Sequence, residues 1–371
     1  MDVTWSQVFA WRMRRQLLEP RADPDPATVA RRLCGIQAQL ASAAELAVAA
    51  RQRQPEPGVV NRALADRALV KTWAMRGTLH LLTPDEAGAY LALVGTIRTW
   101  ERPSWQRAFG VSPAELAALL DAVAEALEDR VLTRDELIGQ VLAATGSHHL
   151  EEQLRSGWGA VLKPLAWSGV LCHGPGQGNR VTFTRPDTWL PGWGGLPEPE
   201  PAARVVIPTY LRAYGPATPE TFDAWLSRGS SRKKDLRGWF AALSDELATV
   251  TVEGRDCLLL AEDVDDLADT EPAEVVRLLP GFDQYVLGPG TSDAELVAAN
   301  RRAQVSRTAG WISPVVVRAG RVAGTWEITG DTVVVTWFPE AGPVPAEALS
   351  SEAEWIARFR GEHLTVKVST G

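Results

Sequence analysis

Apolar residues recur at helical spacing in the first third of the chain, and short β-branched runs follow them. The apolar period predicts helices over residues 5–18, 26–34, 43–51 and 58–66. The runs at residues 70–74 and 78–82 indicate a hairpin that turns at Arg76-Gly77. Pro84 is well placed to open another helix, because proline is favoured at the first helical position.

This order of helices followed by a hairpin recurs twice. The second copy has predicted helices over residues 112–128, 133–144 and 151–168 and a hairpin from 169–172 to 180–183. The third copy follows a Pro/Gly-rich linker at 191–201, with helices over 202–214, 218–226 and 230–243 and a hairpin from 247–252 to 256–260. Three helices before a hairpin is the winged-helix arrangement, in which the hairpin is the wing.

The last hundred residues are richer in strands. Runs at 312–318, 321–328 and 332–338 are separated by tight glycine turns, a helix is predicted over 345–360, and residues 364–368 are a possible closing strand. The pattern predicts an α+β fold of three tandem winged-helix domains and a β-rich C-terminal domain. The expected bounds are 1–108, 109–192, 200–272 and 273–371.

Two long amides, Gln37 and Gln39, lie two residues apart in the short connection between the second and third helices. Gly35 is placed to end the preceding helix, and Ser42 with Glu45 fits a capping box for the next. If the connection is extended, both side chains share a face. By spacing alone, such glutamines usually bond nearby backbone groups or water.

Composition places the chain among ordinary globular proteins. It has 371 residues, 45% of them hydrophobic and 23% charged. It shows no apolar run of membrane-spanning length and no signal-peptide pattern at its start, and Cys34, Cys172 and Cys257 lack metal spacing. We expect reduced thiols, no metal or other cofactor, no membrane partner and a cytoplasmic location.

The net charge of −8 argues weakly against a nucleic-acid partner, but arginines gather locally. Each cluster, including Arg51/Arg53, is by itself expected to be a solvated helix face. His80, on a predicted strand, is expected to be a core residue rather than a catalytic one.

Four phrases distributed along the chain carry a resemblance. They are Gly35-Ile36-Gln37-Ala38-Gln39, Arg76-Gly77-Thr78-Leu79-His80-Leu81, the run from Leu279 to Gly288, and Gly320-Arg321-Val322-Ala323-Gly324-Thr325-Trp326. In order and spacing they resemble the AlkZ-type, or YcaQ-like, winged-helix DNA glycosylases over nearly the full length. The resemblance implies a monofunctional enzyme that excises bulky N7-alkylated purines, unhooks interstrand crosslinks and gives self-resistance to a DNA-alkylating natural product such as azinomycin B.

The family carries catalysis on a Gln-apolar-Gln motif, which implies that Gln37 and Gln39 are catalytic here. An N7-alkylated guanine is already a cationic leaving group, so no strong base is needed. Two amide oxygens suffice to orient a water below C1′ and to face the positive sugar.

The implied partner is double-stranded DNA carrying alkylated purines or crosslinks, bound by a monomer. The predicted DNA contacts are Arg318 and Arg321 beside a turn at Ala319-Gly320, Arg232, Lys233 and Lys234 at a helix start, and Arg301 and Arg302. For each group the alternative is a solvated surface cation.

Two other functions compete with this one. A non-catalytic winged-helix regulator or drug-sequestering DNA binder needs no water site. A drug-modifying hydrolase is disfavoured, because the chain has neither a Gly-x-Ser-x-Gly elbow nor a His-Glu-x-x-His motif.

Overall fold

The computed structural model describes residues 1–157 and 159–371 and has the expected α+β composition. The chain divides into two compact units. The first comprises Met1–Asn61, Ile207–Trp225 and Leu243–Gly371, and the second comprises Arg62–Val206 and Leu226–Ala242. Three of the four divisions fall within helices α4 (Val59–Ala65), α12 (Pro199–Tyr214) and α13 (Pro219–Ser227), and the fourth lies between Ala242 and Leu243.

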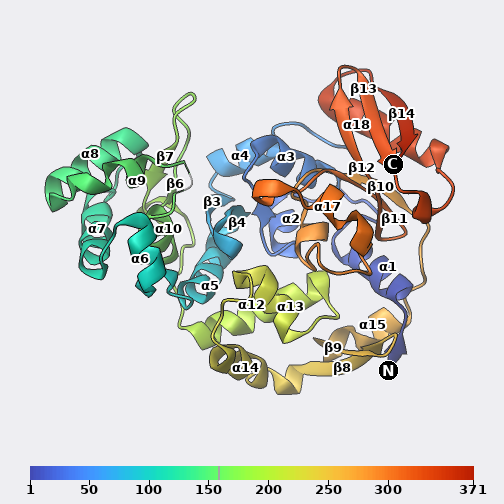
Figure 1. The fold of residues 1–371 in the computed structure, drawn as a ribbon, viewed down its shortest axis with the longest axis horizontal. Coiled ribbons are helices and arrows are strands. Elements are labelled where there is room, and N and C mark those ends of the chain that lie inside the picture. The colour runs from blue at the N-terminus through green and yellow to red at the C-terminus, as the bar shows by residue number, and fades with distance from the viewer. Residues whose placement is uncertain (158) are drawn as a thin grey trace. The chain divides into compact units, whose positions relative to one another are not determined.

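The first unit is built around a five-stranded sheet with the order β10-β11-β12-β13-β14. Its strands are β10 (Val276–Leu279), β11 (Val315–Arg318), β12 (Arg321–Thr329), β13 (Thr332–Trp337) and β14 (Thr365–Thr370). The first four pair antiparallel and β14 pairs parallel to β13. Helix α18 (Ala346–Arg360) lies beside this sheet (Figure 1). The predicted β-rich segment is therefore present, with α18 and β14 where the pattern indicated.

Several helices complete the first unit, together with a three-stranded sheet of order β1-β8-β9. The helices are α1 (Trp5–Arg15), α2 (Pro26–Arg32), α3 (Ala41–Ala49), α15 (Val264–Ala268), α16 (Gln284–Leu287) and α17 (Arg302–Val305). The strands are β1 (Asp2–Val3), β8 (Leu247–Val252) and β9 (Arg255–Leu260). One apolar cluster runs from α1 through both sheets to α18, so these elements share a core.

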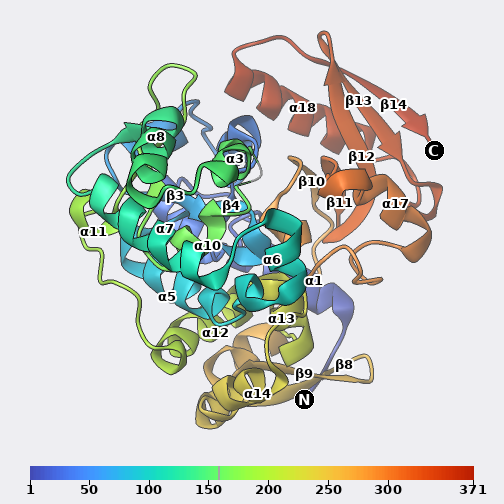
Figure 2. The ribbon, with the colours of Figure 1, turned by 60° about the vertical axis from the view of Figure 1, so that its left-hand side comes forward.

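The second unit contains the first two predicted hairpins, whose strands lie in the order β4-β3-β6-β7-β5. The strands are β3 (Val70–Trp73), β4 (Leu79–Leu82), β5 (Leu132–Thr133), β6 (Cys172–His173) and β7 (Thr182–Thr184). The helices are α5 (Pro84–Gly95), α6 (Pro103–Phe109), α7 (Pro113–Ala126), α8 (Arg134–Thr145), α9 (Glu151–Arg155), α10 (Leu162–Trp167), α11 (Pro186–Trp189) and α14 (Lys233–Ala241). Figure 2 shows α7, α8 and α10 together, and a second apolar cluster joins them.

Capping accounts for where several helices start. Thr133 and Glu136 form the predicted capping box of α8, with each side chain bonded to the other residue's backbone. Asp25 caps α2, where Pro26 is at the first position.

Three local predictions are wrong. Ser42 does not cap α3: the helix starts earlier, its N-cap is Leu40 without a side-chain cap, and the Glu45 carboxylate instead accepts from the backbone N–H groups of Val60 and Asn61. Cys34, at φ 53°, takes the first position after the C-cap of α2, and Gly35 follows it with a positive φ of 95°. The helix predicted over 151–168 is two helices, α9 and α10, and position 158 between them lies outside the described residues.

No helix among the described residues is both long and apolar enough to cross a membrane. The three cysteines are free and buried. His80 is fully buried, as expected of a core residue, and its Nδ1 lies 3.0 Å from the carbonyl oxygen of Thr78. Burial, followed by the charge of Arg76, lowers the pKa of His80 to about 3.

Candidate active site

The predicted catalytic amides lie in the short segment between α2 and α3. Gln37 ends the two-residue strand β2 (Ile36–Gln37), whereas Gln39 lies in the bend that follows. The side chain of Gln37 is buried, with 6% of the residue exposed, and Gln39 is exposed. The two residues therefore do not share one environment, as a fully extended connection would have given them.

The Gln37 side-chain oxygen, Oε1, is one of several buried amide oxygens in this chain that lack a hydrogen-bond partner among the described residues. A buried carbonyl oxygen without a partner costs about 1–3 kcal/mol, so such atoms are rare in stable cores. An acceptor left open in this way is suited to bind a water or a substrate hydrogen.

The end of α2 fixes the backbone that leads into Gln37. Gly35 N–H donates to the carbonyl of Ala30 at 2.8 Å, and Cys34 N–H donates to that of Arg31 at 3.3 Å. These are the two bonds of a Schellman motif, with Cys34 at the left-handed position. The chain therefore turns sharply at Cys34 and Gly35 before entering β2.

Tyr214, at the end of α12, supports the same turn from outside the segment. Its hydroxyl donates to the carbonyl of Leu33 at 2.5 Å, and both residues are buried. Burial raises the pKa of Tyr214 well above its ordinary value, so the hydroxyl remains a donor. Gly288 lies against the Tyr214 ring so closely that a Cβ there would be 2.2 Å from a ring carbon. A larger residue at 288 would displace the ring.

A buried ion pair joins α3 to the start of α16. Both side chains of Arg51 and Asp283 are fully buried, and they form two hydrogen bonds of 2.9 Å. Arg51 also donates to the carbonyl of Ala47, and Asp283 caps α16 through the N–H of Tyr285. The expectation that Arg51 lies on a solvated helix face is therefore wrong, because its charge is neutralised inside the first unit.

Gln284 follows Asp283 and was not singled out from the sequence. It is 1% exposed, and neither Oε1 nor Nε2 has a partner among the described residues. The available signal was a lone amide inside the largely apolar run from Leu279 to Leu287. The surroundings of Tyr214 could not have been found in this way, because no local pattern pairs residue 214 with residue 33.

The turn between β11 and β12 is packed against the protein rather than projecting from it. The carbonyl of Gly320 accepts from the Tyr285 hydroxyl at 2.7 Å, and a Cβ on Gly320 would lie 2.2 Å from Cβ of Phe9. Arg321 donates to Glu295 and lies over the Phe9 ring at 5.0 Å. Arg318 donates to Glu274 and to the carbonyl of Ala341. The geometry thus does not favour insertion of this turn into a groove, although both arginines keep partly exposed side chains.

The other predicted DNA contacts differ in how firmly they are held. Arg301 pairs with Glu340 through bonds of 2.6 and 2.9 Å and lies over Phe338, whereas Arg302 is exposed. Arg232, Lys233 and Lys234 are exposed at the start of α14. Arg232 and Lys234 line an open groove of about 510 Å³ in the second unit. These last cations are accessible to a polyanion.

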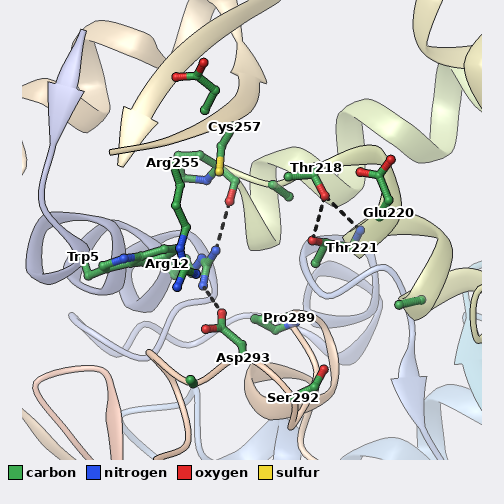
Figure 3. A pocket seen from close by; sticks show the side chains of 15 residues that line it. Trp5, Arg12, Thr218, Glu220, Thr221, Arg255, Cys257, Pro289, Ser292 and Asp293 are labelled. Carbon is green, nitrogen blue, oxygen red and sulfur yellow. Dashed lines mark hydrogen bonds and ion pairs between the residues drawn. The ribbon is translucent and has the colours of Figure 1, made fainter. Parts of the chain in front are cut away.

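A pocket of about 410 Å³ in the first unit is lined by Arg12 and Asp293 among others (Figure 3). The buried Arg12 donates from Nε to the carbonyl of Gly215 and from Nη2 to that of Pro216, and its Nη1 lies 4.0 Å from Asp293. Neither Gln37 nor Gln39 lines this pocket. Arg12 thus braces α1 against the turn between α12 and α13.

Similarity to known proteins identifies the family. The model of the AlkZ-like DNA glycosylases matches residues 30–359. The chain belongs to the AlkZ-like DNA glycosylase family. It is 55% identical over 362 residues to an interstrand DNA cross-link repair glycosylase of Streptomyces sahachiroi, covering 97% of this chain and 98% of that protein. The solved structure of Streptomyces sahachiroi DNA glycosylase AlkZ superposes with a TM-score of 0.97 at 54% identity, and each chain is covered completely.

The resemblance drawn from the four sequence phrases is thereby confirmed at the level of the family. This DNA glycosylase is a hydrolase of N-glycosyl bonds. Among the described residues, no group of His, Cys, Asp and Glu side chains could hold a metal ion.

Proposed function

We propose that this glycosylase hydrolyses the N-glycosidic bond of bulky N7-alkylated purines and unhooks interstrand crosslinks through Gln37 and Gln39. The similarity to an interstrand DNA cross-link repair glycosylase, at 55% identity, supports the substrate class. The observation that carries the proposal is the buried, unpartnered Oε1 of Gln37, two residues from the exposed amide of Gln39.

The chemistry follows from the leaving group. Alkylation at N7 makes the base a cation, and its departure leaves positive charge on the deoxyribose. An amide is too weak a base to remove a proton early, so its contribution is to position water and to direct a carbonyl dipole at the developing oxocarbenium ion. We assign Gln37 and Gln39 to these two tasks. No lysine Schiff base is involved, so the product is an abasic site in an intact strand.

A crosslinked base is tethered to the opposite strand and cannot be flipped into a closed pocket. The exposure of Gln39 supports attack from an open, groove-facing surface. The three hairpins β3–β4, β6–β7 and β8–β9, each following helices, support the tandem winged-helix arrangement with the bounds given above. Such domains place helices against the duplex.

We assign the exposed Arg232, Lys233, Lys234 and Arg302 to phosphate contacts. Three other arginines are weaker candidates for this role, because each already pairs with a glutamate of this chain: Arg301, Arg318 and Arg321. We further propose that the enzyme acts as a monomer in the cytoplasm. There it would protect the chromosome from an alkylating natural product of the azinomycin B type.

The test is base release from a duplex carrying one N7-alkylguanine. After incubation with enzyme, mild base cleaves the strand only at abasic sites. We expect cleavage with the wild type, none with Gln37→Ala/Gln39→Ala, and full cleavage with Gln54→Ala, an exposed glutamine of the same unit. Tight binding by wild type without base release would contradict the proposal and favour the non-catalytic DNA binder.

A further inference from the structure

Trp311 is the one exposed residue among the tryptophans, tyrosines and phenylalanines of residues 1–157 and 159–371, with 41% of it accessible. It is nevertheless held in place. The ring of Phe282, itself buried, meets it edge-on, with centroids 5.2 Å apart and an interplanar angle of 77°. One side of the Trp311 ring is thus supported by the protein while much of the residue remains accessible.

Backbone hydrogen bonds close the loop that carries Trp311 into a small hairpin. Ser306 and Ile312 form an antiparallel bridge, and Arg307 N–H donates to the carbonyl of Trp311 at 2.8 Å. Ala309 and Gly310 at the tip have φ values of 57° and 75°, which close the turn. Arg307 and Trp311 therefore occupy facing positions on the two arms of a small hairpin, and both are exposed.

This hairpin forms one wall of a groove of about 710 Å³. The groove lies over the β12–β13 ladder, whose register pairs Thr325 with Thr336 and Glu327 with Val334. Figure 2 shows α17, which leads into the hairpin, beside the same sheet. Thr325 and Glu327 alternate along β12 on one face of the ladder and line the groove, together with Val334 and Thr336 of β13 and the buried Trp326.

The chemistry of the groove suits one ligand class. An accessible indole stacks on any nucleobase, the exposed guanidinium of Arg307 suits a phosphate, and hydroxyl and amide groups bond base edges or sugar oxygens. The Glu327 carboxylate, which also lines the groove, accepts only from donors such as base amino groups. Stacking requires a base whose face is open, which neighbouring pairs deny in an intact duplex. The volume is within the usual range for sites of small ligands, about 300–1,000 Å³.

We propose that the groove between the 306–312 hairpin and the β12–β13 ladder binds an unpaired nucleotide of the DNA substrate. In this site the base stacks on Trp311 and its phosphate contacts Arg307. The inference rests on the proposed function, because it assigns the nucleotide to the same DNA. A bulky or tethered lesion weakens local stacking, so substrate DNA presents such nucleotides more readily than intact duplex does.

The test measures dissociation constants for undamaged DNA, which the enzyme does not cleave. The probes are a fully paired duplex, the same duplex with one bulged nucleotide, and oligothymidylate. We expect the wild type to favour the bulged duplex and the Trp311→Ala variant to lose about tenfold on it, with little loss on the paired duplex. Trp311→Phe should retain most of the preference.

Arg307→Ala should lower the slope of log affinity against log salt by about one, since one phosphate contact is removed. Arg358→Ala, which removes an exposed arginine of the same unit, should weaken binding less. Circular dichroism at 222 nm checks that each variant is folded.

Two results would overturn the inference. In the first, Trp311→Ala binds the bulged duplex as tightly as wild type. In the second, it loses affinity equally for all three probes, which would make Trp311 a general duplex contact. Base release from N7-alkylguanine DNA is measured separately, so normal release by a variant with unchanged binding would reject the groove and leave the proposed function standing.

Discussion

The Tyr214 hydroxyl donates a 2.5 Å hydrogen bond to the backbone carbonyl of Leu33, four residues before Gln37. Leu33 is the C-cap of α2, and Gly35 and Ile36 lead directly from it to the proposed water-binding amide. Tyr214 thus holds the backbone at the start of the segment that carries the proposed catalytic amides. Because Tyr214 is buried and directed at the backbone, it acts by positioning rather than by touching the substrate.

Replacing Tyr214 by Phe removes this donor while keeping the ring that packs on Gly288. We expect the maximal excision rate to fall roughly ten- to a hundredfold with KM nearly unchanged, because misplacing a reacting group by about an ångström has effects of this size. Single-turnover base release over a range of enzyme concentrations separates the two parameters. Loss of stability without a fall in the saturated rate would show that the contact is only structural.

How much the sequence predicts depends on how local the cause is. The hairpin at Arg76-Gly77 and the cap at Thr133 come from neighbouring residues, and both are present. The capping box predicted at Ser42 is absent because the Glu45 carboxylate instead accepts from the N–H of Val60 at the start of α4, fifteen residues later. Arg51 was predicted to be solvated because its partner, Asp283, is 232 residues away in the sequence. The motif to which we assign catalysis could be found in the sequence, whereas the groups that we propose to position it could not.

Stability should depend on keeping or replacing both members of the Arg51–Asp283 ion pair together. Removing one partner leaves a buried charge unpaired, which costs about 3–5 kcal/mol, whereas an apolar pair of similar volume is often neutral. We expect Asp283→Leu to lower the free energy of unfolding in urea by that amount and Arg51→Met/Asp283→Leu to recover much of it. A double variant no more stable than the single one would show that the pair's geometry, rather than its charge balance, is what matters.

Glu45 should matter for stability and Ser42 should not, because only Glu45 caps a helix in the structure. The Glu45 carboxylate accepts from two N–H groups at the start of α4, so Glu45→Ala should cost about 0.5–2 kcal/mol of stability. Ser42→Ala should have an effect within about 0.5 kcal/mol, as for surface positions without a special contact. Thermal unfolding of the two variants side by side compares them, and a larger loss at Ser42 would restore the original capping box.

Histidine burial predicts a specific acid sensitivity. The unfolded chain binds a proton on His80 below about pH 6.5, whereas the native state does so only near pH 3. Stability from this group is therefore complete above pH 6.5 and is lost as the pH falls toward 3, by about 1.4 kcal/mol per pH unit. Desolvation also lowers the pKa of the half-buried His173 to about 3, so His173 should behave in the same way.

His80→Gln should flatten the dependence of unfolding free energy on pH between about 6.5 and 5, where few carboxylates titrate. The measurement is urea unfolding at closely spaced pH values, and the slope is compared rather than the absolute stability. Parallel curves for variant and wild type would mean that His80 gains its proton without unfolding.

Leu40 is an exposed apolar residue at a helix start, a position where a polar residue would stabilise the fold more. It is the N-cap of α3, where an apolar residue leaves the first N–H groups without a side-chain acceptor, and it is 37% exposed beside Gln39. Apolar side chains such as leucine serve in DNA-binding proteins as wedges against base steps. We therefore expect Leu40 to contact the substrate next to the catalytic amides.

The substitution Leu40→Asn separates these roles, because asparagine is among the best N-cap residues. It should raise the free energy of unfolding by about 0.5–2 kcal/mol and slow excision of N7-alkylguanine roughly tenfold. Leu196→Asn provides a matched control, since Leu196 is 38% exposed in the second unit. A Leu40→Asn enzyme that is both more stable and fully active would leave the exposed leucine without a part in catalysis. A more stable but slower enzyme would show that helix capping is sacrificed here for contact with DNA.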